Sequence, residues 1–243
     1  MAKAPNKSAG KSARAKPEAA KKKPTASTSN AERTEQTRGK LVAAGRELFG
    51  KHGYSNVSTE QIVQRAKVTR GALYHHFGDK RDLFREVTES VEADATQRTA
   101  ATAIANATGL GSTDVGSIGP GSIDPSSIDP WQTALNGSRA FLDICLEPEF
   151  QRIVIVDAPS VLGQAELTEI ANRHGGALIE GMLSALIEAK LIEPLAVKPL
   201  ARVLTGALIN GGLAIADSKD QKATRREVGD VIEALLEGLA VRE

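Results

Sequence analysis

The sequence is poor in cysteine and in aromatic residues, and both shortages exclude classes of protein. Its one cysteine, Cys145, cannot pair within the chain, which excludes a disulfide-stabilised scaffold and predicts a reducing, cytoplasmic compartment. Five Phe, two Tyr and one Trp in 243 residues are too few for a strand-rich protein, or for one that stacks single-stranded bases on aromatic rings.

Long hydrophobic runs are missing as well. No apolar run approaches the roughly 18 residues that a membrane span requires. The lysines near the N-terminus are followed by no apolar stretch, which argues against a secretory signal. We therefore expect no membrane partner.

The sequence also lacks the usual patterns of catalysis and metal binding. We find no glycine-rich phosphate loop, no nucleophile elbow and no carboxylate pair on strands. His75 and His76 are adjacent and so point to different sides of a helix, and Cys145 has no His or Cys at ligand spacing. We expect neither an enzyme nor a cofactor or metal site.

Net charge is nearly absent on average, but its distribution is uneven. The chain carries +1 overall, with +7 on residues 1–31, +3 on residues 32–90 and −9 on residues 91–243. A basic front and an acidic back predict that a nucleic-acid partner binds the front of the chain.

Two segments are predicted to lie outside the folded core. Residues 1–31 are rich in Lys, Ala, Ser and Pro and are expected to form a disordered tail, either solubilising or adding sequence-independent affinity for duplex DNA. Within the expected insertion 108–130, residues 116–130 form three tandem pentapeptides that each end in proline, which forbids a regular helix. This insertion is either a passive loop or a lid over a ligand pocket.

Hydrophobic periodicity predicts helices in the rest of the chain. In the first part they cover residues 35–49, 59–66 and 69–77, with a long helix beginning near Lys80. In the second part they cover residues 131–146, 149–157, 165–191, 197–217 and 224–241. The 197–217 helix is apolar on more than one side and carries three glycines, which predicts close backbone packing and burial in a subunit interface.

Residues 59–77 have the pattern of a helix-turn-helix, two short helices joined by a tight turn. The second helix begins with small and polar residues, so it could approach base edges, and Arg70 could bond guanine. Ser58 or Thr59 is expected to cap the first helix, with Gln61 at capping-box spacing. An ordinary three-helix bundle would show the same pattern.

Residues 34–90 resemble the N-terminal domain of TetR-family transcriptional repressors. The resemblance rests on Thr37-Arg38, on Leu41–Ala44 with Glu47–Phe49, on His52–Tyr54 and on the runs Val57–Val63, Ala66–Phe77 and Asp79–Phe84. It implies an all-α homodimer in which residues 32–90 bind DNA and residues 91–243 bind a ligand and dimerise.

The resemblance also implies roles for particular residues. In the family, the last two helices of each subunit pair to form a four-helix dimer bundle. The residues expected at DNA are Thr37, Arg38, Ser58, Thr59, Thr69, Arg70, Gly71, Ala72, Tyr74, His75 and Lys80. The residues expected at the dimer interface are Leu204, Leu208, Gly211, Gly212, Ile215, Val228, Ile232, Leu235 and Leu239.

The ligand site is the least determined part of the sequence. Candidates are polar or aromatic residues inside otherwise apolar helices: Asp94, Arg98, Trp131, Arg139, Phe141, Asp143, Arg152 and Asp157. The simpler alternative for Arg139 and Asp143 is a surface i, i+4 pair, worth a few tenths of a kcal/mol. Arg152 and Asp157 could simply be exposed, and Trp131 and Phe141 could be core residues.

The predicted function is a repressor that binds a palindromic operator as a homodimer and is released by a small-molecule effector. An activator of the same family, a DNA-compacting protein that binds through its basic arm, and an enzyme with an incidental helix-turn-helix are the alternatives.

Overall fold

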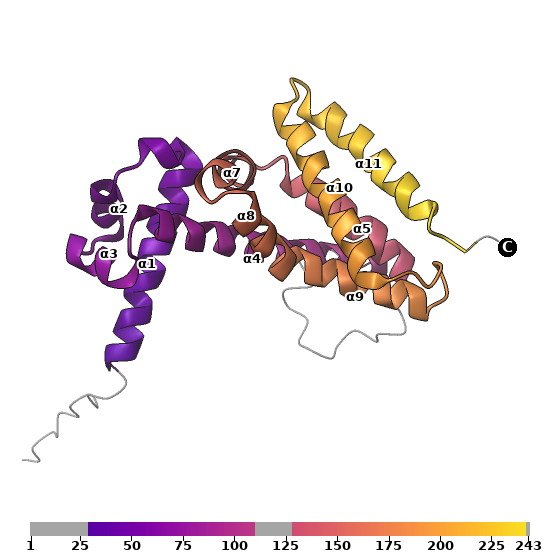
Figure 1. Ribbon diagram of the computed structural model, residues 1–243, viewed down its shortest axis with the longest axis horizontal. Helices are drawn as coiled ribbons and strands as arrows, with labels where there is room; N and C mark the ends of the chain where they lie inside the picture. Colours follow the sequence, from indigo (N-terminus) through magenta and orange to yellow (C-terminus); the bar gives the residue numbers. More distant parts are fainter. Residues whose placement is uncertain (1–28, 110–127, 242–243) are drawn as a thin grey trace, which may run out of the picture.

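The computed structural model describes residues 29–109 and 128–241. These segments are helical, with short 3-10 and π-helical turns, and the predicted all-α fold is confirmed. Residues 1–28 of the predicted tail and 110–127 of the predicted insertion lie outside the described residues. Figure 1 shows a small helical unit at one end of the molecule and a larger helical body at the other.

The small unit contains α1 (Ser29–His52), the 3-10 turn η1 (Tyr54–Asn56), α2 (Thr59–Ala66), α3 (Arg70–His76) and the start of α4 (Lys80–Thr108). α1 begins before the predicted residue 35, so the predicted end of the tail at residue 31 falls inside a helix. Residues 29–38 contain neither Gly nor Pro, which allows the helix to extend. Their polar sequence carries no apolar stripe by which periodicity could reveal it.

Local capping fixes the ends of the short helices. The Gln61 amide donates to the Ser58 hydroxyl at 3.2 Å and the Ser58 amide donates to the Gln61 side chain at 2.8 Å, so the predicted capping box forms. Lys67 ends α2 in the left-handed region with φ of 55°. The Thr69 hydroxyl then accepts a hydrogen bond from the Ala72 amide at 3.2 Å. These bonds satisfy backbone donors that each helix start leaves free.

An aromatic cluster forms the centre of the small unit. The rings of Phe49 and Phe84 lie 5.2 Å apart between centroids, nearly perpendicular to each other, and Tyr54 packs against Phe84 at 4.9 Å. Leu73 of α3 is fully buried against this core. The inner face of α3 is therefore anchored while its other face stays free.

α4 joins the small unit to the larger body (Figure 1). It has 29 residues, or roughly 44 Å at the usual helical rise, and packs on α1 and on α5. One hydrophobic cluster extends along it from Leu41 to Ile215. The predicted domain boundary between residues 90 and 91 thus falls inside a continuous helix, and the two parts share a core.

The larger body is a bundle of helices, some of them interrupted by wider turns. Its elements are α5 (Pro130–Ile144), α6 (Pro148–Phe150), the π-helical turn η3 (Gln151–Asp157), α7 (Ala158–Val161), α8 (Gln164–Ala171), the π-helical turn η4 (Asn172–Gly176), α9 (Ala177–Glu188), α10 (Val197–Asp217) and α11 (Gln221–Glu237). η3 ends shortly before Pro159, whose ring would clash with a carbonyl of a regular helical turn. η4 contains the Gly175-Gly176 pair, which weakens the regular helix predicted over 165–191.

α10 has the predicted bounds and is the most apolar of the long helices. By length and composition it could cross a membrane, because an 18-residue window of this helix has a mean hydropathy of 1.3. Inside the protein, 33% of that window is buried. Its glycines, threonine and asparagine hide it from a search for uninterrupted apolar runs. It packs against α9, α11 and α5, and an interior helix of a helical bundle meets the same criteria.

Candidate nucleic-acid interface and buried cavity

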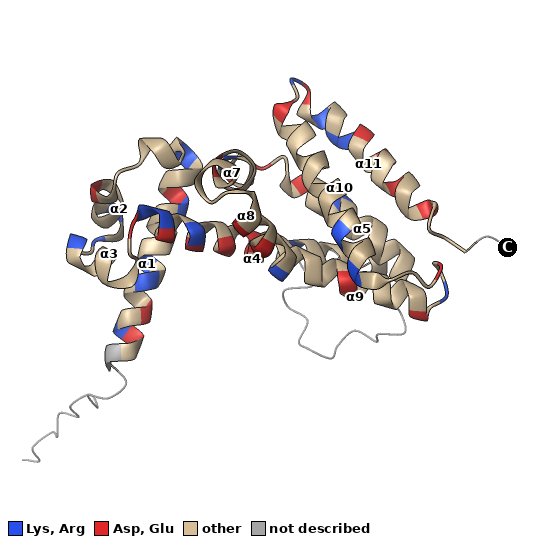
Figure 2. Ribbon diagram, viewed as in Figure 1, with Lys and Arg blue, Asp and Glu red and all other residues tan. Residues whose placement is uncertain are grey.

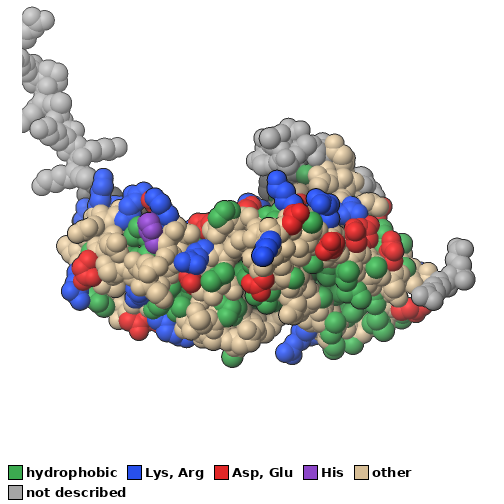
Figure 3. Space-filling model, turned by 90° about the horizontal axis from the view of Figure 1, so that it is seen from above, with side chains coloured by type: hydrophobic (Ala, Val, Ile, Leu, Met, Phe, Trp, Pro, Cys, Tyr) green, Lys and Arg blue, Asp and Glu red, His purple; other side chains and the backbone are tan. Residues whose placement is uncertain are grey.

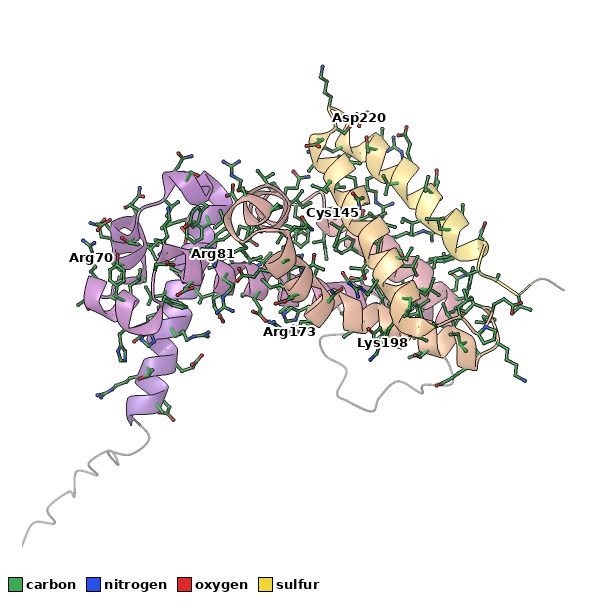
Figure 4. All side chains as sticks on the ribbon, in the orientation of Figure 1. Arg70, Arg81, Cys145, Arg173, Lys198 and Asp220 are labelled. Carbon is green, nitrogen blue, oxygen red and sulfur yellow. The ribbon has the colours of Figure 1, made fainter. Side chains whose placement is uncertain are left out.

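The outward face of α3 is open to solvent. Arg70, Gly71 and Tyr74 are exposed, while Leu73 on the opposite face is fully buried. The Arg70 guanidinium lies 3.0 Å from the Glu60 carboxylate and 5.6 Å from the centroid of the Tyr74 ring, and Figure 4 shows it at the edge of the small unit. A helix with a small N-terminal surface beside an arginine is suited to reading base edges in the major groove.

Gly71 has room for a larger side chain within its own chain. A Cβ atom added there would meet only the Thr69 hydroxyl, at 4.0 Å. Glycine inside a helix costs about 1 kcal/mol relative to alanine, and the packing of this chain gives no reason for that cost. The missing side chain allows an external surface to approach the α3 backbone closely.

Two of the predicted DNA contacts hold the small unit together. The Lys80 ammonium donates to the Tyr54 and Val57 carbonyl oxygens at 3.0 and 2.9 Å and lies 4.0 Å from the Tyr54 ring centroid. Burial lowers the pKa of Lys80. Arg38 pairs with Glu86 at 2.7 Å, which ties α1 to α4. Both cations have partners inside the chain.

The other predicted DNA contacts have accessible side chains or cap helices. Thr37 donates to the Arg33 carbonyl on α1 at 2.8 Å. Thr59 lies in the first turn of α2 and His75 in the last turn of α3, and both are at least partly exposed. Figure 3 shows basic side chains and a histidine gathered at this end of the molecule.

Two arginines tie the small unit to the larger body. Arg46 of α1 lies 2.7 Å from Glu149 and 3.2 Å from Asp94, and its hydrogen bond with Glu149 raises the pKa of the guanidinium. Arg81 of α4 donates to two backbone carbonyls at the end of α7, at 3.1 and 3.0 Å, and lies 2.6 Å from Glu166. Charges of both signs therefore meet along α4 where the two parts join (Figure 2).

The turn η3 contacts the segment that precedes α2. The Tyr54 amide donates to the Asp157 carboxylate at 2.7 Å. The Arg152 side chain lies against Gly53, where a Cβ atom would stand 2.6 Å from the guanidinium nitrogens. Gly53 also has φ of 78°, a left-handed conformation that favours glycine there. A movement of η3 would act directly on the start of the helix-turn-helix.

A cavity of about 160 Å³ lies in the larger body between α4, α5, α9, α10 and α11. Its wall is mostly apolar. An engineered cavity of about 150 Å³ holds benzene, so this one accommodates a group about as large as a single ring. A second cavity of about 260 Å³ adjoins it, and Glu92, Phe141, Ala171 and Ile209 line both.

Three buried polar side chains that line the first cavity have no partner among the residues that the structure describes. Glu92, Thr99 and Thr205 are each more than nine-tenths buried. Neither threonine hydroxyl has a hydrogen-bond partner, and Glu92 forms no hydrogen bond or ion pair with the described residues. Burial raises the pKa of Glu92 to about 7. Because buried polar groups are normally bonded, three orphans in one cavity indicate a place for a polar ligand.

The C-terminal helices expose an apolar face. Val203 and Leu213 on α10 and Val231 and Leu235 on α11 are large hydrophobic residues with 37 to 68% of their surface exposed. Hydrophobic side chains gather at this end of the molecule in Figure 3. A contiguous exposed apolar patch indicates a surface for association.

Comparisons with known proteins identify the family. Residues 41–87 match the family model described as bacterial regulatory proteins, tetR family, and residues 131–239 match the tetracyclin repressor-like C-terminal domain. The crystal structure of a TetR-family transcriptional regulator from Pectobacterium atrosepticum is 31% identical, with a TM-score of 0.69 over 88% of this chain and 98% of that one. The chain belongs to the TetR family of transcriptional regulators.

Named relatives match this TetR-family chain over different lengths. The transcriptional regulator AcrR of Shigella flexneri is 42% identical over 60 residues, which is 25% of this chain and 28% of that regulator. The transposon Tn10 TetC protein of Escherichia coli is 25% identical over 175 residues, 70% of this chain and 73% of TetC. The match to AcrR therefore covers little more than a quarter of that protein.

The cavity of this TetR-family regulator has a different lining from the predicted ligand site. Of the predicted ligand residues, Phe141 lines it, and Trp131 packs beside a neighbouring apolar cluster. The charged candidates pair with other side chains outside the cavity: Asp94 with Arg46, Arg98 with Glu147, Arg139 with Glu233, Asp143 with Arg225, and Arg152 with Asp157. Most of these partners come from other helices, so sequence spacing could not reveal them.

Most of the predicted dimer residues are not part of the exposed apolar face of α10 and α11. Five are buried within the chain: Leu204, Gly211, Gly212, Ile215 and Ile232. Leu208, Val228 and Leu239 are half-buried, and Leu235 is exposed. A Cβ atom at Gly211 would lie 2.6 Å from Val228, and one at Gly212 would lie 2.9 Å from Cys145. These glycines thus permit close packing of α10 inside one chain, and the outward face carries Val203, Leu213 and Val231 instead.

The buried polar residues of the cavity are not among the residues predicted from the sequence to bind a ligand. Glu92 and Thr99 are seven residues apart, two helical turns, and so lie on one face of α4. Glu92 stands between Val91 and Ala93. An acidic residue on the buried face of a helix was the signal available in the sequence.

Proposed function

We propose that this TetR-family regulator is a cytoplasmic homodimer that represses transcription by binding a palindromic operator, and that a small molecule in the cavity releases it. The observation that carries the proposal is the outward face of α3, where Arg70 is exposed and Gly71 serves no packing need of the chain. Helix-turn-helix dimers place two such helices in successive major grooves, about 34–36 Å apart.

Arg70 is the residue that we expect to recognise a base. Its partner Glu60 is exposed, so the ion pair between them is weak in water and the guanidinium can turn to guanine acceptors. Thr69, Gly71 and Ala72 would lie against base edges, while Thr59, Tyr74 and His75 would meet phosphates. Lys80 and Arg38 would support this surface through their contacts within the chain.

The exposed apolar face of α10 and α11 supports the dimer. A two-fold axis brings the same patch of both subunits together, which would cover Val203, Leu213, Val231 and Leu235 at once. Such an arrangement would form a four-helix bundle of α10 and α11 from each subunit.

Release by an effector would pass through contacts described above. A ligand between α4 and α9–α11 would favour one position of α4, and the Arg81 and Asp157 contacts connect that position to α2 and α3. The ligand can shift the equilibrium only by its difference in affinity for the two states.

Binding to labelled duplexes tests the DNA-binding part of the proposal. We expect fluorescence anisotropy to show tight binding to the upstream region of its own gene and weak competition by random DNA. Arg70→Ala should weaken operator binding about tenfold to a hundredfold and random binding little. Arg226→Ala, in an exposed residue of α11, is the matched control. If random DNA competes as well as the operator, the protein is a non-specific DNA-compacting protein.

A reporter assay distinguishes repression from activation. We expect deletion of the gene to raise transcription from the bound promoter. A fall in transcription would identify an activator with the same DNA-binding surface.

A further inference from the structure

We propose that the cavity binds a small lipophilic cation, with one protonated or quaternary nitrogen on an apolar body about the size of a single ring, and that Glu92 is its counter-ion. This inference rests on the proposed role of the cavity as the effector site. The observations that support it are the negative charge of Glu92, the hydroxyls of two threonines that have no partner in the described part of the chain, and the ring of Phe141. All of these side chains line the cavity.

The charge of the cavity wall selects against anions. Glu92 is the only charged side chain among the described residues that line either cavity. Residues 110–127 contain no Lys or Arg in their sequence. A carboxylate or phosphate ligand would therefore meet a like charge, with no basic side chain of the cavity lining to offset it.

A cation supplies what Glu92 lacks. A buried carboxylate without a hydrogen-bond partner is costly unless a positive charge or a donor reaches it. Thr99 lies on the same face of α4, and Thr205 lies on α10 in the same wall. The two hydroxyl oxygens can accept hydrogen bonds from other parts of the ligand, because Thr99 lies two helical turns from Glu92 along the cavity wall.

The walls around Glu92 suit the rest of such a ligand. Phe141 lines both cavities together with Glu92, and an aromatic face attracts cations. Leucine, isoleucine and alanine side chains supply the apolar remainder of the wall. A nitrogen bound at Glu92 can thus place its apolar body in either cavity.

Three molecules of nearly equal shape test the charge preference. Isothermal titration of the full-length protein at pH 7.5 would compare 2-phenylethylamine, which is cationic, with neutral 2-phenylethanol and anionic phenylacetate. We expect the amine to bind at least about thirtyfold more tightly than the alcohol, as a desolvated charge pair does, and phenylacetate to bind least.

Glu92→Gln keeps the shape of the side chain and removes its charge. We expect this variant to lose the preference for the amine while it binds the alcohol as the natural protein does. Glu169→Gln, in an exposed carboxylate of α8, is the matched control and should keep the preference. Binding of the alcohol also shows that the variant is folded and its cavity intact.

The pH dependence of amine binding provides a second readout. Phe141, Cys145, Ala171 and Ile209 face Glu92 across the cavities from the other helices, and of these only Cys145 titrates. Burial and the nearby Glu92 raise the pKa of Cys145 to about 12, so it stays neutral. Because the amine requires the ionised carboxylate, its affinity should rise about tenfold from pH 6 to pH 8, and Glu92→Gln should abolish this rise.

The outcomes separate this inference from the proposed function. If the operator is bound specifically but the alcohol or phenylacetate binds as tightly as the amine, the cation site is refuted and the regulator stands. An unchanged amine preference in Glu92→Gln also refutes it. If the amine binds through Glu92 while no operator is recognised, the cation site stands and the proposed function fails.

Discussion

Glu92 should make the unliganded protein less stable as pH rises. Most acidic residues have the opposite effect, because their pKa is lowered in the folded state. The pKa of Glu92 is raised from 4.5 to about 7 because the carboxyl is buried. Well below pH 4.5 the group is protonated in both the folded and the unfolded chain and has no effect. As pH rises toward 7 the unfolded chain loses the proton first, so the folded state loses stability until the pKa of about 7 is passed.

The size of this effect follows from the two pKa values. Their difference corresponds to about 3 kcal/mol in total, of which roughly 2 to 3 kcal/mol falls between pH 5 and pH 8. For a chain of this length that equals roughly 5 to 10 °C in Tm. Glu92→Gln removes the titrating group, so the Tm of the variant minus that of the natural protein should increase by this amount from pH 5 to pH 8.

Thermal unfolding followed by circular dichroism measures this difference. Protein concentration must be the same at each pH, because a dimer melts at a concentration-dependent temperature. Glu169→Gln should give a Tm difference that changes little over the same range. A constant difference between Glu92→Gln and the natural protein would refute the reasoning, because it would mean that the carboxyl already has a partner or lies in water.

Three further predictions concern the surfaces of the molecule. Gly71→Ala should raise stability by up to about 1 kcal/mol in denaturant unfolding, yet weaken operator binding in an anisotropy titration; unchanged operator affinity would mean that DNA does not approach α3 there. Asp157→Ala should cost about 1.5 to 3 kcal/mol, because the Tyr54 amide loses a charged acceptor, and should weaken the effect of cavity ligands on operator binding; undiminished release would exclude η3 from the coupling. Val231→Asp should shift the protein to monomers in light scattering at micromolar concentration, whereas Arg226→Ala should leave the dimer intact.

Much of the helical framework could be predicted from the sequence because its signals are local. The capping box at Ser58 and Gln61 and the apolar spacing around Leu73 act within one or two helical turns, and the structure shows α2 with its predicted bounds. The start of α1 could not be predicted in this way. Its first residues are polar and exposed, so neither burial nor periodicity reveals the helix.

The dimer residues could not be predicted reliably from local sequence patterns. Periodicity indicated that α10 and α11 are apolar on several sides, but it could not tell which side packs within the chain. The sequence predicts Gly211 and Gly212 as sites of contact between subunits, whereas in the structure they allow Val228 and Cys145 of the same chain to approach. Only the tertiary arrangement shows that the outward side carries Val203 and Val231.

Most of the predicted ligand residues lie away from the cavity for a related physical reason. Polar residues inside apolar helices are conspicuous in a sequence, but the conspicuous ones, such as Arg152 and Asp157, proved to contact the helix-turn-helix unit. A charged side chain that forms an ion pair within the folded chain links two structural elements. Its charge is then already balanced and is not available to bind a ligand. Glu92, on the buried face of α4, has no partner among the described residues. In the proposed mechanism, the ligand would bind at the Glu92 carboxylate, and the contacts at Asp157 would connect the resulting movement to the helix-turn-helix.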